Sequence, residues 1–231
     1  MRVVLTREEG HNDALRARLP RGAEAIEVPL TRTVSRDHAA VAEEATRDPR
    51  APFASLVVTS ARGAPYVDDV VASLRPGWRT YAVGPATAHA LDGLGWGASV
   101  VGREGAGALG RAVSEGPVLV LAAATTRPEL VAELERRGLA AATVACYATE
   151  PLVPDEAGRR ALRSADVVVI GAPSAWAVAR PLVAATAWVL VPGATTGAEV
   201  RRSHERVLEG WDGDLAGRLE ALEHGGIRDQ R

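Results

Sequence analysis

The chain has 231 residues, of which 47% are hydrophobic and 24% charged, and its formal net charge at pH 7 is −2. This length allows one large domain or two domains of roughly 100 residues each, and the composition excludes a disordered or fibrous protein. Aromatic residues make up only 4% of the chain and neither half carries a basic stripe, so we expect no nucleic-acid partner.

Short apolar runs recur along the chain and predict strands that are buried on both faces. Helix-like segments separate most of them. In the segment 128–137, for example, Glu133 faces Arg137 four residues later, and Gly138 is a typical helix stop. This alternation predicts an α/β fold with parallel sheets flanked by helices. The expected strands are 3–5, 25–28, 55–58, 81–83, 118–121, 143–146, 167–170 and 188–191.

A weak internal repeat indicates that the chain contains two copies of one α/β unit. RGAEAIEVPLTRT at residues 21–33 resembles RGLAAATVACYAT at 137–149, an offset of 116 residues. Later, VTSARGA resembles IGAPSAWA, and VGPATAHAL resembles PGATTGAEV; there the offset between Gly84 and Gly193 is 109 residues. We therefore expect two similar parallel-sheet domains with a cleft between their facing edges.

Four turns follow apolar runs and precede helix-like segments, at 59–62, 84–87, 172–174 and 193–196. Ligands of open α/β sheets bind at the carboxyl ends of the strands, and the start of a helix favours an anion. Four such turns that converge would hold a polyanion with few dedicated charges. Each turn also has a purely structural interpretation, because Ser and Thr are ordinary N-caps.

Three further side chains lie near these turns. Tyr147 ends the apolar run in VACYATEP, shortly before Pro151. A phenol is protonated at neutral pH and can donate a hydrogen bond to a departing hydroxyl. The alternative is a tyrosine half-buried at a domain edge. Arg7 and Arg62 are candidates for binding an anion, but they are also typical of solvated surface charges.

Several other kinds of chemistry find no support in the sequence. All 27 basic residues are arginine, which excludes a Schiff-base or P-loop lysine. The five histidines show no ligand spacing, so we expect no metal, and no GxSxG turn supports a Ser-His-Asp arrangement. The single Cys146 and the strand-like opening predict a cytoplasmic protein, and the lack of a long apolar run predicts that no segment spans a membrane. Because no long apolar face stands out, we expect a monomer.

The order and spacing of several motifs make the chain similar to the uroporphyrinogen-III synthase family, and the similarity covers most of its length. The motifs are VVLTREEGHNDALRARL, VPL at 28–30, VVTSARG at 57–63, YAVGPATAHALDGLG, ELVAELERRGL, CYATEP, GAPSAW at 171–176 and PGATTGAEV.

This resemblance implies two α/β domains joined by a two-stranded linker, with the first domain discontinuous in sequence. Residues 1–33 and 152–231 would form domain 1, and residues 36–146 the inserted domain 2. The linkers would lie at about 34–35 and 147–151.

The resemblance also implies a cofactor-free reaction. Hydroxymethylbilane, a linear tetrapyrrole with eight carboxylates, is cyclised with loss of water and inversion of ring D to give uroporphyrinogen III. Tyr147 matches the tyrosine thought to assist hydroxyl departure. The expected substrate-binding residues are Thr59, Ser60, Ala61, Arg62, Gly84, Ala86, Thr87, Ala172, Ser174, Gly193, Thr195, Thr196 and Arg7.

The chain also departs from the family pattern. Ala172 stands where the family usually has Ser or Thr, residues 122–125 lack the usual glycine and polar pair, and the helix after Thr196 lacks the usual glycine turn. A catalytically silent paralogue that binds a tetrapyrrole or another anionic small molecule is therefore the alternative interpretation. An unrelated two-lobed binding protein of the periplasmic type is a third, which the missing signal peptide disfavours.

Overall fold

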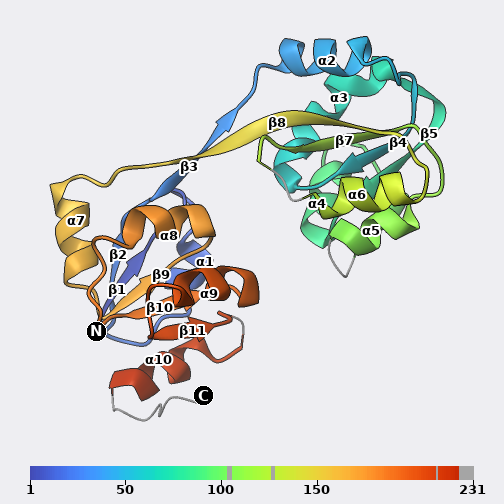
Figure 1. Ribbon diagram of the computed structural model, residues 1–231. Helices are drawn as coiled ribbons and strands as arrows, with labels where there is room; N and C mark the ends of the chain where they lie inside the picture. Colours follow the sequence, from blue (N-terminus) through green and yellow to red (C-terminus); the bar gives the residue numbers. More distant parts are fainter. Residues whose placement is uncertain (103–105, 126–127, 212, 224–231) are drawn as a thin grey trace. The chain divides into compact units, whose positions relative to one another are not determined.

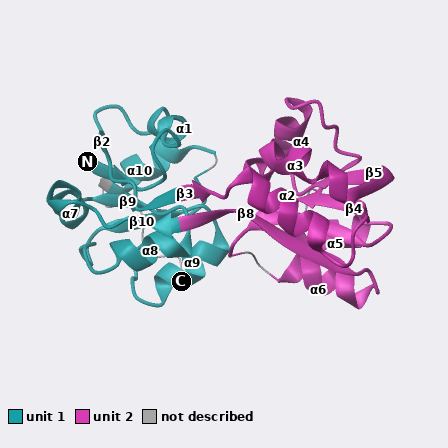
Figure 2. Cartoon of the chain, turned by 90° about the horizontal axis from the view of Figure 1, so that it is seen from above, with its two compact units in different colours: residues 1–32, 150–231 teal, residues 33–149 magenta. Residues whose placement is uncertain are grey.

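The computed structural model describes residues 1–102, 106–125, 128–211 and 213–223, and it divides into two compact units (Figure 1). Unit 1 consists of residues 1–32 and 150–231, and unit 2 consists of residues 33–149 (Figure 2). Each unit is a mainly parallel sheet with helices on both faces, so the predicted α/β class is confirmed. No helix within the described ranges is long and apolar enough to cross a membrane.

The sheet of unit 1 has five strands in the order β11-β10-β9-β1-β2, and every pair of neighbours is parallel. The strands are β1 (Arg2–Leu5), β2 (Glu24–Glu27), β9 (Val167–Val169), β10 (Trp188–Val191) and β11 (Val207–Glu209). Their helices are α1 (Asp13–Arg16), α7 (Glu156–Arg163), α8 (Pro173–Ala179), α9 (Ala194–Arg201) and α10 (Leu215–Glu223).

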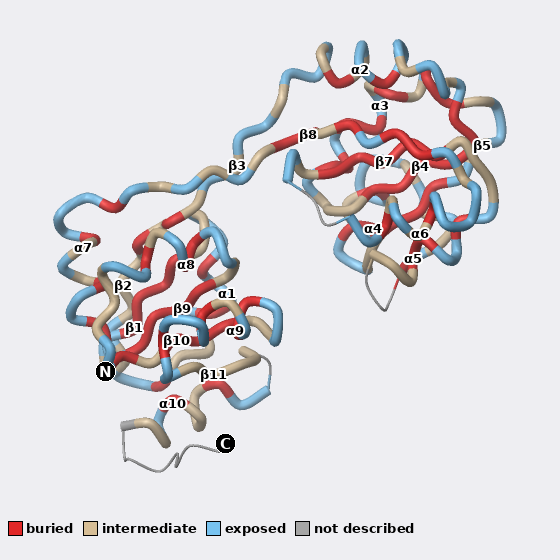
Figure 3. Tube along the Cα trace, viewed as in Figure 1, coloured by how far each residue is buried: buried red, intermediate tan, exposed pale blue. Residues whose placement is uncertain are grey.

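Successive residues of β1 face opposite sides of this sheet, as the two-residue period of a strand requires. Val4 belongs to a core with residues of α7, α8 and α9, whereas Val3 and Leu5 belong to a core with residues of α1 and α10. All three side chains are fully buried. The central strands are accordingly buried along their length in both units (Figure 3).

The sheet of unit 2 has six strands in the order β3-β8-β7-β4-β5-β6. Five of them run parallel. The edge strand β3 is antiparallel to β8. The N–H of Arg36 bonds the carbonyl of Cys146, and the N–H of Leu152 bonds the carbonyl of Leu30, as antiparallel pairing requires. The strands are β3 (Thr31–Ser35), β4 (Phe53–Val58), β5 (Leu74–Ala82), β6 (Val100–Val101), β7 (Val118–Ala123) and β8 (Ala141–Pro151).

Helices again cover both faces of the sheet in unit 2. On one face lie α2 (His38–Arg47), α3 (Val67–Val70) and α4 (Pro85–Asp92), with the 3₁₀ turns η1 (Ala61–Tyr66) and η2 (Val71–Ser73) in the same part of the chain. On the other face lie α5 (Ala106–Ala112) and α6 (Glu129–Arg136). The chain passes from one unit to the other within β3 and within β8.

The strand orders agree with the internal repeat. From edge to edge, β6-β5-β4-β7-β8 in unit 2 corresponds to β11-β10-β9-β1-β2 in unit 1. The pairs of similar segments occupy corresponding places, since β8 takes the position of β2, β4 that of β9, and β5 that of β10. With the extra edge strand β3 left aside, each unit combines two strands from one half of the chain with three from the other half.

The structure corrects one local prediction and adds two strands to those expected. Glu133 pairs with Arg136, three residues later, whereas Arg137 donates to the carbonyls of Gly110 and Val113. Gly138 has φ +74°, a left-handed conformation that favours glycine at the end of a helix. Strands β6 and β11 were not expected from the sequence, because they are short edge strands without a buried apolar run, whereas β3 includes residues 34–35, which the family resemblance assigned to the two-stranded linker.

We predict that Cys146 is inert in the folded protein. The side chain is fully buried in β8, and burial raises the pKa of its thiol to about 12. Since only the thiolate attacks an alkylating reagent, iodoacetamide should leave Cys146 unmodified at pH 8 and label it once urea unfolds unit 2. Mass spectrometry of the intact protein measures the labelling, and rapid modification without urea would contradict the packing around β8.

Candidate active site

Parallel pairing brings the predicted site residues of unit 2 to one edge of its sheet. The turn 59–62 follows the end of β4, and the turn 84–87 follows the end of β5. Tyr147 lies beside Ala123, the last residue of β7. Because β4, β5, β7 and β8 are mutually parallel, all of these positions lie at or near the carboxyl edge.

The predicted site residues of unit 1 gather at the carboxyl edge of its own sheet. Arg7 follows β1, Ala172 and Ser174 follow β9, and Gly193 follows β10. Ser174 and Thr195 are exposed, whereas Arg7, Ala172 and Gly193 are half-buried. In both units, therefore, the residues that the sequence analysis selected lie at the edge where ligands of α/β sheets bind.

Helices α4 and α9, which correspond to each other in the repeat, begin in similar ways. The N-cap is Gly84 in α4 and Gly193 in α9, and neither helix start is closed by a side-chain hydrogen bond. A Cβ atom at either glycine would meet no atom within 4 Å, so the space in front of both helix starts is open. The first helical residue is Pro85 in α4 and Ala194 in α9. Only α9 therefore presents a first N–H group, and both helix starts favour an anion.

A buried threonine occupies the third position of each of these helices. Thr87 is 3% exposed and Thr196 is 5% exposed. Neither hydroxyl has a hydrogen-bond partner among the described residues. Neither hydroxyl oxygen is fully buried, so each can still bond a ligand atom or a water without leaving the protein.

In the turn at 59–62, unlike at Thr87 and Thr196, the side-chain hydroxyls form hydrogen bonds within the protein. The hydroxyl of Thr59 donates to the carbonyl of Leu121 at 3.0 Å. Ser60 is the N-cap of η1, and its hydroxyl oxygen accepts a hydrogen bond from the N–H of Arg62 at 3.2 Å. Ser60 can still donate its own proton. The structural interpretation therefore accounts for Thr59 and for part of Ser60.

The three tyrosines of the chain are all buried but differ in what their hydroxyls contact. Tyr66 donates to the carbonyl of Arg36 at 2.9 Å, and Tyr81 bonds the hydroxyl of Ser114 at 3.0 Å. The hydroxyl of Tyr147 has no hydrogen-bond partner among the described residues, although the residue is only 7% exposed. Tyr147 is therefore the tyrosine whose hydroxyl can donate a hydrogen bond to a ligand without breaking one within the described part of the protein.

An arginine covers the ring of Tyr147. The guanidinium carbon of Arg62 lies 5.8 Å from the ring centroid, within the range of a cation–π contact. This contact joins two predicted site residues, one from the turn after β4 and one from β8. It places a positive charge beside the phenol, where a ligand anion would also be attracted.

Two further residues lie at the carboxyl edge of unit 1 and were not predicted as site residues from the sequence. Gly171 follows β9, and Trp211 follows β11. The guanidinium carbon of Arg7 lies 5.9 Å from the centroid of the Trp211 ring. The signal was the tryptophan in VLEGW, directly after an apolar run, and it was overlooked because β11 was not recognised as a strand.

A cavity of about 750 Å³ lies in unit 1 apart from these groups. Four carboxylate side chains and a single arginine line it, so its charge is wrong for a polycarboxylate. Arg16 donates a hydrogen bond to Glu27 and holds the pKa of that carboxyl below its usual value, which keeps it charged. The cavity contains none of the predicted site residues and is lined by Glu8, Glu9, Ile26, Glu27, Val28, Pro29, Thr31, Arg32, Leu152, Val153, Pro154, Asp155, Ala157 and Gly158.

The contrast among the threonines yields a test of which hydroxyls serve the fold. We expect Thr59→Val to lower the free energy of unfolding by about 0.5–1.5 kcal/mol, because it removes the bond to Leu121. Thr87→Val and Thr196→Val remove no internal bond and should leave it unchanged within about 0.5 kcal/mol. Urea unfolding of the three variants measures this. If all three are destabilised equally, Thr87 and Thr196 are structural residues.

Comparisons with known proteins agree with the resemblance seen in the motifs. The family model described as uroporphyrinogen-III synthase HemD matches residues 13–202. A mutant uroporphyrinogen III synthase from Thermus thermophilus is similar in structure, with a TM-score of 0.63 and 16% identity over 97% of this chain and 98% of that one. A uroporphyrinogen-III synthetase from Helicobacter pylori gives a TM-score of 0.62 and 14% identity over 97% and 99%. Comparison with curated proteins finds no match. Because the family model spans most of the chain, the protein belongs to the uroporphyrinogen-III synthase family.

Proposed function

We propose that the protein is a uroporphyrinogen-III synthase, a lyase that cyclises hydroxymethylbilane with loss of water and inversion of ring D in haem biosynthesis. The match of the family model over residues 13–202 carries this conclusion. The substrate can lose its hydroxyl and close to the uninverted isomer unaided. The task of the enzyme is therefore mainly to hold a flexible chain in one geometry and to steer the closure.

We propose Tyr147 as the residue that assists the departure of the hydroxyl. As the C–O bond breaks, the electron pair stays on oxygen, and a proton from the phenol completes the water molecule. Two features support this role: the hydroxyl of Tyr147 has no hydrogen-bond partner among the described residues, and Arg62 lies over its ring at 5.8 Å. A positive charge over the ring also attracts a carboxylate of the substrate towards the phenol.

We propose that the substrate carboxylates are held mostly by neutral donors. The open starts of α4 and α9 and the hydroxyls of Thr87 and Thr196 supply such donors, and each helix start contributes about 0.3–1 kcal/mol to binding an anion. Further expected contacts are Ser60, Ala61, Ala86, Ser174 and Thr195. Eight carboxylates allow many such contacts to act on one molecule.

The departures from the family pattern do not remove these donors. Ala172 is the N-cap of α8 and supplies no side-chain oxygen, yet this also leaves the start of α8 uncapped by the protein. A catalytically silent paralogue remains the alternative, but it is not favoured, since the proposed proton donor is retained. We further propose, from the composition and the lack of a long apolar face, that the enzyme works as a cytoplasmic monomer.

The decisive experiment replaces Tyr147 by Phe. Incubation with freshly made hydroxymethylbilane, with isomers III and I separated by chromatography, should show isomer III formation slowed by roughly 10²–10⁴-fold or somewhat less. The fold should be unaffected, because Phe keeps the ring and no internal hydrogen bond is lost. A Tyr147→Phe enzyme that works at the wild-type rate would remove the phenol from the mechanism.

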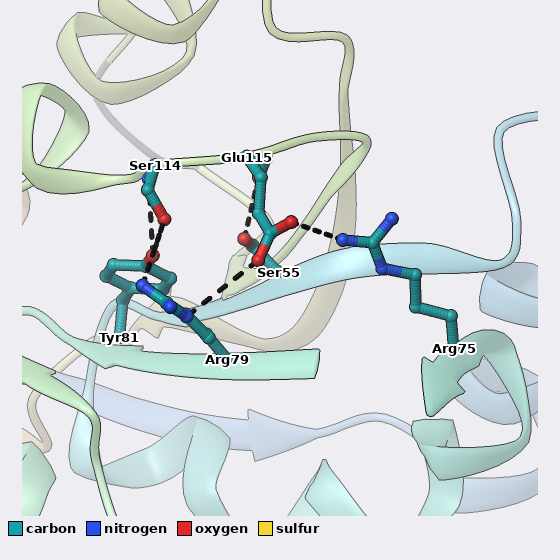
Figure 4. A network of polar contacts seen from close by, with 6 residues as sticks. All are labelled: Ser55, Arg75, Arg79, Tyr81, Ser114 and Glu115. Carbon is teal, nitrogen blue, oxygen red and sulfur yellow. Dashed lines mark hydrogen bonds and ion pairs between the residues drawn. The ribbon is translucent and has the colours of Figure 1, made fainter. Parts of the chain in front are cut away.

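Tyr81 offers a matched control in the same unit. Figure 4 shows its hydroxyl against Ser114, in a polar network that also holds Ser55, Glu115 and two arginines. Ser114 lies before the start of β7, away from the carboxyl edge. Tyr81→Phe should therefore lower the free energy of unfolding by about 0.5–1.5 kcal/mol and leave the isomer III rate within about twofold.

A further inference from the structure

The position of Trp211 is fixed by contacts with the neighbouring β10 and α10. Gly210 has φ +78°, which favours glycine and turns the chain at the end of β11. Its N–H bonds the carbonyl of Val191 at the end of β10. Arg218, in α10, donates to the carbonyls of Glu209 and Gly210 at 2.8 and 2.6 Å. The backbone that carries Trp211 is therefore anchored, and its ring packs on the core formed with α10.

Trp211 follows β11, yet its ring lies near residues that follow β9 and β1 at the same carboxyl edge of the sheet. Both side chains lie close to Gly171, which follows β9. A Cβ atom at Gly171 would lie 3.6 Å from Cγ of Arg7 and 3.9 Å from Cη2 of Trp211. Arg7 and Trp211 thus form one surface over Gly171, half-buried and beside the uncapped start of α8.

The guanidinium of Arg7 has no carboxylate partner among the described residues, and its contact there is the indole ring. Neighbouring arginines behave differently. Arg2 pairs with Glu24 at 3.0 Å, and Arg16 pairs with Glu27. A guanidinium that contacts an aromatic ring keeps N–H donors that can bind an anion.

We propose that Arg7 and Trp211 form a subsite that binds one carboxylate-bearing pyrrole ring of the linear tetrapyrrole. The indole supplies a flat apolar surface for the pyrrole ring, and Arg7 pairs with a carboxylate on the same ring. This inference rests on the proposed function, and it assigns Trp211 a role in substrate binding. Neither the indole nor the carboxylate changes its bonding in the reaction, so the contact is made equally in the ground state and the transition state.

A second pair in the same sheet provides a matched control. Arg206 lies over Trp188 at 5.7 Å, almost the same distance as in the Arg7–Trp211 pair. Trp188 is the first residue of β10 and Arg206 immediately precedes β11, so this pair lies at the amino edge. Substitutions in the two pairs remove the same kind of contact from opposite edges of one sheet.

The experiment compares steady-state kinetics of Trp211→Leu, Trp211→Phe, Arg7→Gln, Trp188→Leu and the wild type with hydroxymethylbilane. We expect Trp211→Leu and Arg7→Gln each to raise KM about 5–30-fold with kcat within about twofold, because a contact made equally in both states affects KM alone. Trp211→Phe should restore most of the loss. Trp188→Leu should change KM by less than about twofold, even if it lowers Tm as much as Trp211→Leu does.

A titration with uroporphyrin III, the air-stable oxidised form of the product, separates the two proposals. The change in porphyrin absorbance gives Kd without turnover, and Trp211→Leu should weaken it by a similar factor. If the wild type forms no isomer III, the proposed function fails, while the titration still decides the subsite. If Trp211→Leu and Trp188→Leu have the same KM and the same Kd as the wild type, the subsite is wrong and the Arg7–Trp211 pair is structural.

Discussion

Parallel pairing of buried strands is the constraint from which the arrangement of the site follows. In a parallel sheet all strands end at the same edge, so residues from distant parts of the sequence meet there. The direction of the strands alone brings them together, and no additional contact between them is needed. Arg7, Gly171 and Trp211 each stand two residues after a strand of unit 1. Gly84 follows β5 of unit 2 in the same way. The position after a strand is thus the place where this fold can vary its chemistry without changing its core.

The duplication determines how these positions are divided between the units. Because each unit takes strands from both halves of the chain, the corresponding helices α4 and α9 lie in different units. The exchange requires the chain to pass twice between the units, through β3 and β8. Tyr147 lies in β8, three residues before the crossing at Glu150. The proposed proton donor is therefore on a long strand whose buried part is held by β7.

The sequence predicted the central strands well, because a continuous apolar run reports burial on both faces. It missed β11, whose three residues are only half-buried, and with it Trp211. It could not separate Thr59 from Thr87, since both are threonines near the start of a helical segment. Only the tertiary structure shows that the hydroxyl of Thr59 reaches the carbonyl of Leu121, whereas that of Thr87 reaches no described partner. For the same reason, the three buried tyrosines look alike in sequence and differ in the structure.

A flexible polyanion poses two separate physical problems, attraction and orientation, and the proposed site offers different groups for each. Backbone N–H groups at a helix start point in a fixed direction, so they orient a carboxylate but attract it weakly. Arginine attracts strongly but loses rotamer freedom when it is ordered, which reduces the net gain. An arginine that lies on an aromatic ring, as Arg7 does on Trp211, is already partly ordered before the ligand arrives. Aromatic residues are scarce in this chain, yet Trp211 and Tyr147 each lie under an arginine at a carboxyl edge. Each ring restricts the orientation of its arginine. The positive charge is therefore held in one place, where the helix starts alone would provide only weak dipoles.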